Sequence, residues 1–364
     1  MTGLSSPSDS LYMALTNELP AFLSKSLLQC KSLPALPSVA LRVLDIARSS
    51  RATLNDYAKA IEHDPALTMR LVALANSAYY ARASTSIHTC IEAMQRLGLN
   101  ATLAVVLGFT LFQYAQGGTY RNRTWQRAIT SALVARYLAE QLCPDKSGNT
   151  FTLALLQDIG ILALQAAYPE EAEALYADTA LSHGEITLSE QAYFGCDHTL
   201  VGAWLAAKWG MPDHTVMTIR QSHESFLLND KALLCIRLSG PIADAWLSRN
   251  PASQLAAVLY QLKTVSYISA LKIDEVLHNV QQQTDILANA LNMTTSVEVD
   301  SMTLLAEAHQ LLFQHTLMLS SQLEDQKQAL VSLRYPDENQ KEHSRWDASL
   351  KGQRSGLIRR KKTD

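Results

Sequence analysis

A small set of side chains able to hold protons or metal ions stands out from apolar surroundings. Asp158 interrupts an apolar run that extends over residues 151–166. His198 and His223 fall on the apolar faces of the two helical segments that follow, and Asp244 is a further carboxylate. Imidazole and carboxylate groups that meet in a helical pocket would suit a divalent metal ion that activates water.

The same residues allow a structural interpretation. A carboxylate inside an apolar helix costs several kcal/mol unless it is paired, so Asp158 requires a partner. Each histidine could be a core residue that bonds a backbone carbonyl or Asp158 itself. No fixed ligand spacing such as His-Glu-x-x-His occurs, and this favours the structural interpretation over a working metal site.

Local signals indicate that helices position these side chains. Asp64-Pro65 reads as an N-cap followed by proline at the first helical position. Thr89 and Glu92 have the spacing of a capping box, and Gly98 stands where that helix should end. No segment alternates apolar and polar residues between turn signals. We therefore expect an all-α fold of short helices.

Two further helices carry the candidate histidines. The first begins after Asp197 and ends at Trp209-Gly210, and Asp213 opens the second. His198, Gly202, Leu205 and Trp209 share one face of the first helix, and Val216, Ile219 and His223 share one face of the second. The apolar segments 101–112 and 151–166 are expected to be buried helices.

Leucines late in the chain predict a long helix over residues 301–334. Leu305, Leu312 and Leu319 repeat at seven residues, and Leu323 and Leu330 continue after a four-residue step. The pattern indicates a short coiled-coil seam with a stutter, or the core edge of a long helix. A homodimer through this helix is one expectation. Residues 335–364 are expected to form a flexible basic tail.

Composition limits the class of protein. The 364 residues are 48% apolar and 18% charged, which excludes a wholly disordered chain. Residues 341–364 carry eight Lys/Arg against three Asp/Glu, so the net charge of −3 combines a body of −8 and a tail of +5. That tail could bind nucleic acid or an anionic surface, although a generic charged terminus is favoured and no nucleic-acid partner is expected.

The same composition predicts a cytoplasmic location. Five scattered cysteines without a Cys-x-x-Cys pair indicate reduced thiols. The first residues lack the pattern of a secretory signal, and the apolar run 101–112 is too short to span a bilayer, so no membrane span is expected.

Four motifs occur in order: Leu33-Pro-Ala-Leu-Pro37, Glu62-His-Asp-Pro-Ala-Leu67, Ala75-Asn-Ser-Ala-Tyr-Tyr80 and Arg96-Leu-Gly-Leu99. Together with the His198-to-Pro212 segment and His223-Glu224, they resemble the HDOD domain over residues 26–225. The residues that carry the resemblance are Leu33, Pro34, Leu36, Pro37, Asp64, Pro65, Leu67, Asn76, Ser77, Leu97, Gly98, Gly202, Trp209 and Pro212. The resemblance implies an all-helical relative of the HD and HD-GYP metal-dependent phosphohydrolases that acts in bacterial signalling or as a scaffold.

Departures from the catalytic relatives imply a degenerate site. Arg127 takes the position of an upstream histidine, and the His-Asp pair reads Gln157-Asp158. The degenerate site then consists of Arg127, Gln157, Asp158, His198, His223 and Asp244. A fixed positive charge repels a metal cation, and Arg127 could instead pair with Asp158. No catalytic residue, metal or cofactor is expected; Asp158, His198 and His223 are the ligands if a metal binds.

The resemblance also divides the chain. Residues 1–25 are an N-terminal helical extension, 26–225 the HDOD domain and 226–300 an additional helical region. The long helix resembles the connector that precedes GGDEF domains. We expect a non-enzymatic signalling or scaffold protein that acts through protein contacts, in cyclic di-GMP-related signalling, with a diguanylate cyclase or kinase as partner. The alternative is a residual metal-dependent phosphohydrolase of the HD superfamily.

Overall fold

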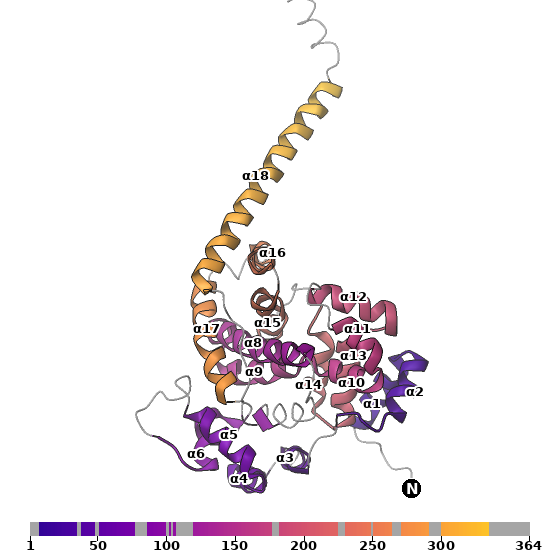
Figure 1. Ribbon diagram of the computed structural model, residues 1–364, viewed down its shortest axis with the longest axis vertical. Coiled ribbons are helices and arrows are strands. Elements are labelled where there is room, and N and C mark those ends of the chain that lie inside the picture. Colours follow the sequence, from indigo (N-terminus) through magenta and orange to yellow (C-terminus); the bar gives the residue numbers. More distant parts are fainter. Residues whose placement is uncertain are drawn as a thin grey trace, which may run out of the picture. The chain divides into compact units, whose positions relative to one another are not determined.

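A computed structural model gives the fold of the chain (Figure 1). It describes residues 7–34, 38–47, 51–76, 86–99, 102, 105–106, 119–176, 182–224, 230–248, 250–263, 271–290 and 300–334. The regular elements within these ranges are helices, which confirms the all-α prediction. Leu36, Pro37, Ser77, most of segment 101–112 and the whole of residues 335–364 lie outside them.

The helices fall into three groups along the chain. The first group is α1 (Pro7–Glu18), α2 (Ala21–Gln29), α3 (Ser38–Ala47), α4 (Leu54–Glu62), α5 (Pro65–Ala75) and α6 (Cys90–Leu97). The second is α8 (Thr119–Leu142), a short 3₁₀ turn (Pro144–Lys146), α9 (Ser147–Leu156), α10 (Ile159–Ala167), α11 (Pro169–Tyr176), α12 (His183–Phe194), α13 (His198–Lys208), α14 (Asp213–Gln221) and α15 (Lys231–Leu247). The third is α16 (Pro251–Lys263), α17 (Ile273–Ala290) and α18 (Ser301–Arg334).

The predicted helix ends are confirmed by their hydrogen bonds. Asp64 accepts from the backbone N–H groups of Ala66 and Leu67 at the start of α5. Thr89 and Glu92 form both bonds of a capping box, and Gly98 ends α6 with a φ of +79°. Asp197 caps α13. The cap residues therefore set these boundaries through short-range contacts alone.

Helix α8 is the centre of the packing, and α9, α15 and α17 lie against it. Helices α10 and α13 form a second packed pair, and α1 also contacts α13. Trp204 of α13 is fully buried and donates a hydrogen bond from its indole N–H to Thr16 of α1. The predicted N-terminal extension is thus part of the packing around α13.

We expected the apolar segment 151–166 to form one buried helix, but the structure divides it into two. Helix α9 ends at Leu156 and α10 starts at Ile159, with Gln157-Asp158 at the break. Asp158 occupies the N-cap position of α10 but makes no capping bond with its side chain. Because the helix is interrupted here, the carboxylate can turn away from the helix axis toward neighbouring elements.

Helices α10 and α13 approach one another backbone to backbone. A Cβ atom on Gly160 would overlap the carbonyl oxygen of His198 and lie 2.6 Å from the amide nitrogen of Gly202. A Cβ on Gly202 would in turn lie 3.1 Å from the Gly160 nitrogen. These two glycines let α10 and α13 pack closely, and this packing brings Asp158 beside His198.

One stretch of the described residues, Asn149–Ala167, is long and apolar enough to cross a membrane, but 89% of its most apolar window is buried inside the protein. A stretch buried to this extent is typical of a helix in the protein core. Residues 1–308 form one compact unit, and residues 309–364 form another. The described part of the second unit consists of α18 from His309 onward, so the predicted long helix is present.

Candidate functional site

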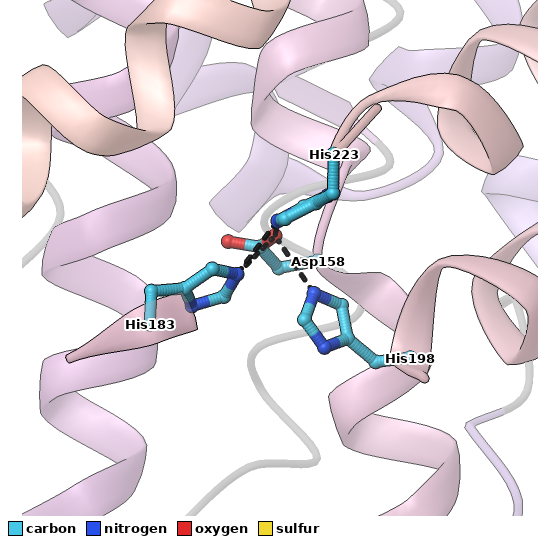
Figure 2. Close-up of side chains that lie close together, drawn as sticks. All are labelled: Asp158, His183, His198 and His223. Atoms are coloured by element: carbon cyan, nitrogen blue, oxygen red, sulfur yellow. Dashed lines mark hydrogen bonds and ion pairs between the residues drawn. The ribbon is translucent and has the colours of Figure 1, made fainter. Parts of the chain in front are cut away.

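A buried cluster of one carboxylate and three imidazoles lies beside the break between α9 and α10. Its members are Asp158, His183, His198 and His223, and their candidate ligand atoms all lie within 4.8 Å of one another. In Figure 2 the three rings surround the Asp158 carboxylate. His183 and His198 are the first residues of α12 and α13, and His223 lies in the turn after α14.

The ring atoms of the three histidines converge on one oxygen of Asp158. The Nε2 atoms of His198, His223 and His183 lie 3.4, 3.6 and 3.8 Å from Asp158 Oδ1. The Nε2 atoms of His183 and His223 are 2.6 Å apart. We call Asp158 Oδ1 with these three rings the imidazole side of the site.

A second carboxylate fixes the orientation of His198. Glu190 of α12 accepts hydrogen bonds from His198 Nδ1 at 2.7 Å, from the His198 backbone N–H at 2.9 Å and from the Tyr176 hydroxyl at 2.6 Å. With Nδ1 engaged, Nε2 is left to face Asp158. A carboxylate behind the ring is the arrangement that typically orients a metal-binding histidine.

The other oxygen of Asp158 belongs to an ion-pair network. Arg127 of α8 donates from Nη1 to Asp158 Oδ2 and from Nε to Asp244 Oδ1, the latter at 2.7 Å. A third, longer bond of 3.4 Å joins Nη2 to Asp244 Oδ2. The pairing that we predicted between Arg127 and Asp158 is therefore present. We call Arg127, Asp244 and Asp158 Oδ2 the guanidinium side.

Helix α15 leaves room for the guanidinium group. A Cβ atom on Gly240 would lie 2.5 Å from Arg127 Nη2, closer than packed atoms normally approach. The bare backbone at this position lets the fork of Arg127 reach both carboxylates. Asp244 stands one helical turn further along α15, so Gly240 and Asp244 share one face of that helix.

Burial and charge shift the pKa values of the cluster in different directions. Burial, aided by the charge of His198, lowers the pKa of His223 to about 3, and burial also depresses the pKa of His183 strongly. For His198 the carboxylates Glu190 and Asp158 outweigh burial and raise the pKa to about 10. Burial alone would raise the pKa of Asp158, yet Arg127, His183 and His198 together hold it well below its usual range.

The residues on the imidazole side fit a metal ion. Asp158 Oδ1 and His198 Nε2 are buried, and neither has a hydrogen-bond partner. They form an ion pair at 3.4 Å, and the Nε2 atoms of His183 and His223 face the same space. One carboxylate oxygen and three imidazole nitrogens are thus presented together, a donor set that suits a metal ion. The guanidinium side leaves no comparable opening, because Arg127 already bonds Asp158 Oδ2 and both oxygens of Asp244.

The structure places the sequence-predicted site residues in two groups. Arg127, Asp158, His198, His223 and Asp244 meet at the site. Gln157 is buried beside Asp158 in the chain, and its side-chain nitrogen lacks a hydrogen-bond partner among the described atoms. His223 lies beyond the end of α14 at Gln221, not on its helical face as we expected.

Two residues of the site were not singled out from the sequence, His183 and Glu190. They are seven residues apart on α12, a spacing that places them on one face of a helix. The capping box of Ser182 and Glu185 marks the start of that helix and could have drawn attention to His183. Nothing local shows that this face meets Asp158.

Among solved structures, two relatives have a similar fold. A protein of Shewanella amazonensis SB2B named "Putative phosphohydrolase" is 23% identical, covers 73% of this chain and 98% of its own, and gives a TM-score of 0.57. A protein of Marinobacter aquaeolei VT8 named "Putative signal transduction protein" is 21% identical, covers 77% of this chain and 66% of its own, and gives a TM-score of 0.52. At these identities the likeness shows the fold alone.

Sequence comparisons give the family. A Treponema pallidum (strain Nichols) relative, named "Uncharacterized protein", is 25% identical over 193 residues, which are 52% of this chain and 37% of the relative. This chain thus matches little more than a third of that relative's length. The sequence profile of the HDOD domain matches residues 33–225, more than half of the chain. The chain therefore belongs to the HDOD domain family.

Proposed function

We propose that this chain is a non-enzymatic signal-transduction or scaffold protein that acts through protein contacts. The observation that carries the proposal is the Arg127 guanidinium between Asp158 and Asp244. Two-metal hydrolysis needs a cation at each of two adjacent positions, about 3.5–4 Å apart, to stabilise the attacking and leaving oxygens. One such position here is filled by a side chain that cannot exchange or bind water as a metal does.

The space at the site supports the same proposal. A cavity of about 40 Å³ reaches the cluster and is lined in part by Arg127, His183 and Asp244. Pockets that enclose a small-molecule ligand typically measure about 300–1,000 Å³. The volume that the described residues enclose is thus of the size that holds a few water molecules.

The long helix α18 offers a surface for protein contacts, and we propose a second copy of the chain as its occupant. Leu319, Leu323 and Leu330 are exposed on it. Steps of four and seven residues between them are those of the two seam positions of a heptad, so the stutter we inferred is unnecessary. Gln326 fills the seam position between Leu323 and Leu330, and Thr316 fills the one before Leu319; polar residues there typically fix the register of a coiled coil.

A signalling module of this kind passes on its state by contact with a partner protein. A diguanylate cyclase or a kinase in a cyclic di-GMP-related pathway is the partner class that we propose, in the cytoplasm. All five cysteines are free in the structure, as suits a reducing compartment. Affinity capture from the native host followed by mass spectrometry identifies the partner, and recovery of such an enzyme supports the proposal.

Turnover assays test the absence of enzymatic function. The purified full chain is incubated with cyclic di-GMP and with a generic phosphodiester in the presence of Mn²⁺, Fe²⁺, Mg²⁺ or Ca²⁺. We expect no hydrolysis above background. Turnover that disappears in both His198→Ala and His223→Ala would overturn the proposal.

Sedimentation equilibrium tests the dimer. Leu323→Lys with Leu330→Lys places two charges in the seam, and we expect the chain to become monomeric. Gln328→Lys is the matched control, because Gln328 is exposed on the side of α18 away from the seam. A wild-type chain that is already monomeric would contradict this part of the proposal.

A second candidate function is a residual metal-dependent phosphohydrolase. The convergence of three Nε2 atoms on Asp158 Oδ1 favours it. A divalent ion held there would supply Lewis-acid activation of water. Glu190 would keep the His198 ring in place, and the low exposure of His183 and Asp158 would exclude bulk water. The turnover assay above decides between the two candidates.

A further inference from the structure

The carboxylate of Asp158 divides its two oxygens between different kinds of partner. Oδ2 bonds the Arg127 guanidinium, whereas Oδ1 faces the three imidazole Nε2 atoms. Arg127 continues from Asp158 to Asp244 and so joins the two carboxylates. Asp158 therefore stands between two positions for positive charge, one filled by the chain and one open to a ligand.

The charges around the cluster limit the number of metal ions that the site can hold. Asp158, Asp244 and Glu190 contribute three carboxylates, and Arg127 contributes one guanidinium. A metal ion displaces the proton of His198, and with all three imidazoles neutral these four groups carry two net negative charges, while Arg123 adds a positive charge near Asp244. One divalent cation offsets the negative charge, whereas a second would leave uncompensated positive charge in the same space.

We propose that the imidazole side is a site for a single transition-metal ion of the Zn²⁺ class, and that Arg127 is a resident cation that closes the second metal position. Imidazole nitrogens suit zinc and similar ions, whereas Mg²⁺ and Ca²⁺ prefer oxygen ligands. The ligands are Asp158, His183, His198 and His223. This inference holds whether or not the chain turns over a substrate, so it stands or falls separately from the proposed function.

Titration of the full chain with Zn²⁺ alone, after treatment with a chelator and dialysis, tests the site. Calorimetry and elemental analysis should both give one tight equivalent per chain. His223→Ala should weaken binding at least tenfold, and Glu190→Gln, which leaves the four ligands in place but weakens the support of His198, should weaken it by about 10–100-fold. His88→Ala is the control, because His88 is exposed on a distant segment. Equal binding by His223→Ala and the wild type would overturn the site.

The role of Arg127 is tested by counting metal ions in a variant. Arg127→Ala opens the space between Asp158 and Asp244, and we expect it to bind two Zn²⁺ per chain. Arg127→Ala combined with Asp244→Asn should return to one. A wild type that takes two, or an Arg127→Ala protein that takes one, would contradict the role.

Loss of folding in Arg127→Ala still leaves a decisive measurement. The variant is then refolded in rising Zn²⁺, because a cation between the two carboxylates should replace the lost guanidinium charge. Recovery of folded protein that exceeds the recovery of the Arg127→Ala/Asp244→Asn protein supports the role of Arg127. Equal recovery of the two variants would refute it.

Discussion

On both sides of Asp158, helices bring polar side chains to a carboxylate oxygen, but only the guanidinium side has a complete set of hydrogen bonds. On the guanidinium side every oxygen of Asp244 and the Oδ2 atom of Asp158 have a donor from Arg127. On the imidazole side Asp158 Oδ1 and His198 Nε2 have none. Arg127 brings a permanent charge that completes its side without a ligand, whereas on the imidazole side only His198 is charged and the rings of His183 and His223 stay neutral.

The difference has a physical consequence for stability. The guanidinium side pairs buried charges, so removal of one partner leaves the desolvation cost of the remaining charges uncompensated. The imidazole side holds buried polar atoms without hydrogen-bond partners, and their free-energy cost is already present in the metal-free protein. Disruption of the guanidinium side should therefore weaken folding, whereas loss of a neutral ring of the imidazole side, such as His223, should mainly weaken ligand binding near neutral pH.

The largest effect is expected from Arg127→Met. Methionine keeps much of the length of the side chain but removes the guanidinium that pairs with both Asp158 and Asp244. Removal of one partner from a buried ion pair costs about 3–5 kcal/mol, and we expect the free energy of unfolding to fall by that amount. Urea denaturation followed by circular dichroism measures it. A loss of less than about 1 kcal/mol, the usual value for exposed pairs, would show that the guanidinium side is not essential.

A smaller effect is expected from Gly160→Ala, which acts on the packing behind the imidazole side. The new methyl group would overlap the backbone of His198 and Gly202, which cannot rotate away as a side chain can. Overpacking of this kind costs about 1–3 kcal/mol. Zn²⁺ affinity should fall as well, since Asp158 and His198 are forced apart.

Gly184→Ala is the matched control for Gly160→Ala. Gly184 is also a helical glycine, in α12, but a Cβ atom there would meet nothing within 4 Å. We expect its unfolding midpoint in urea to match or slightly exceed that of the wild type, because alanine is the better helix former, and its Zn²⁺ affinity to match. Equal losses in the two variants would mean that the contact between α10 and α13 does not determine the result.

These elements also show how far the sequence could predict the site. Helix starts such as Asp64 and Thr89 could be predicted because a cap depends on residues two or three positions away. The pairing of Arg127 with Asp158 could be predicted because a buried carboxylate demands a partner, and the family resemblance pointed to the position. Local chemistry and charge compensation thus carried the successful predictions.

The parts that the sequence did not reveal depend on tertiary packing. Glu190 reaches the site by hydrogen-bonding His198 of α13, and His183 lies on the same face of α12, but no spacing within α12 encodes that contact. The polar pair Gln157-Asp158 was visible as an interruption of the apolar run, but the apolar residues on both sides favoured one buried helix over a break. His223 was assigned to a helical face by periodicity, although α14 ends two residues earlier.

The pH dependence of stability should separate the rings of the imidazole side in metal-free protein. The pKa of His198 is raised to about 10, so its charge stabilises the fold fully below the unfolded value of about 6.5 and less as pH rises. The pKa of His223 is lowered to about 3, so its contribution is present above about 6.5 and lost as pH falls. Both contributions therefore coincide near pH 6.5.

Two variants check this dependence in urea denaturation series on chelator-treated protein. Glu190→Gln removes the charge that most raises the pKa of His198, so the decline of stability on the alkaline side should become shallower. His223→Gln should make the decline on the acid side shallower and leave the alkaline side unchanged. If Glu190→Gln alters the acid side alone, the assignment of His198 as the charged ring is wrong.

The smallest effect is expected from Gly240→Ala, which tests the guanidinium side without removing a charge. The added methyl would press on Arg127 Nη2, the atom with the longest bond to Asp244, so the fork can shift at modest cost. Alanine gains roughly 0.5–1 kcal/mol over glycine in a helix interior, and we expect the clash to cancel that gain. In an Arg127→Met background the clash is absent, and the gain should reappear. A double-mutant cycle in urea therefore yields a coupling of about 1 kcal/mol if Gly240 makes room for Arg127, and none if the two positions are independent.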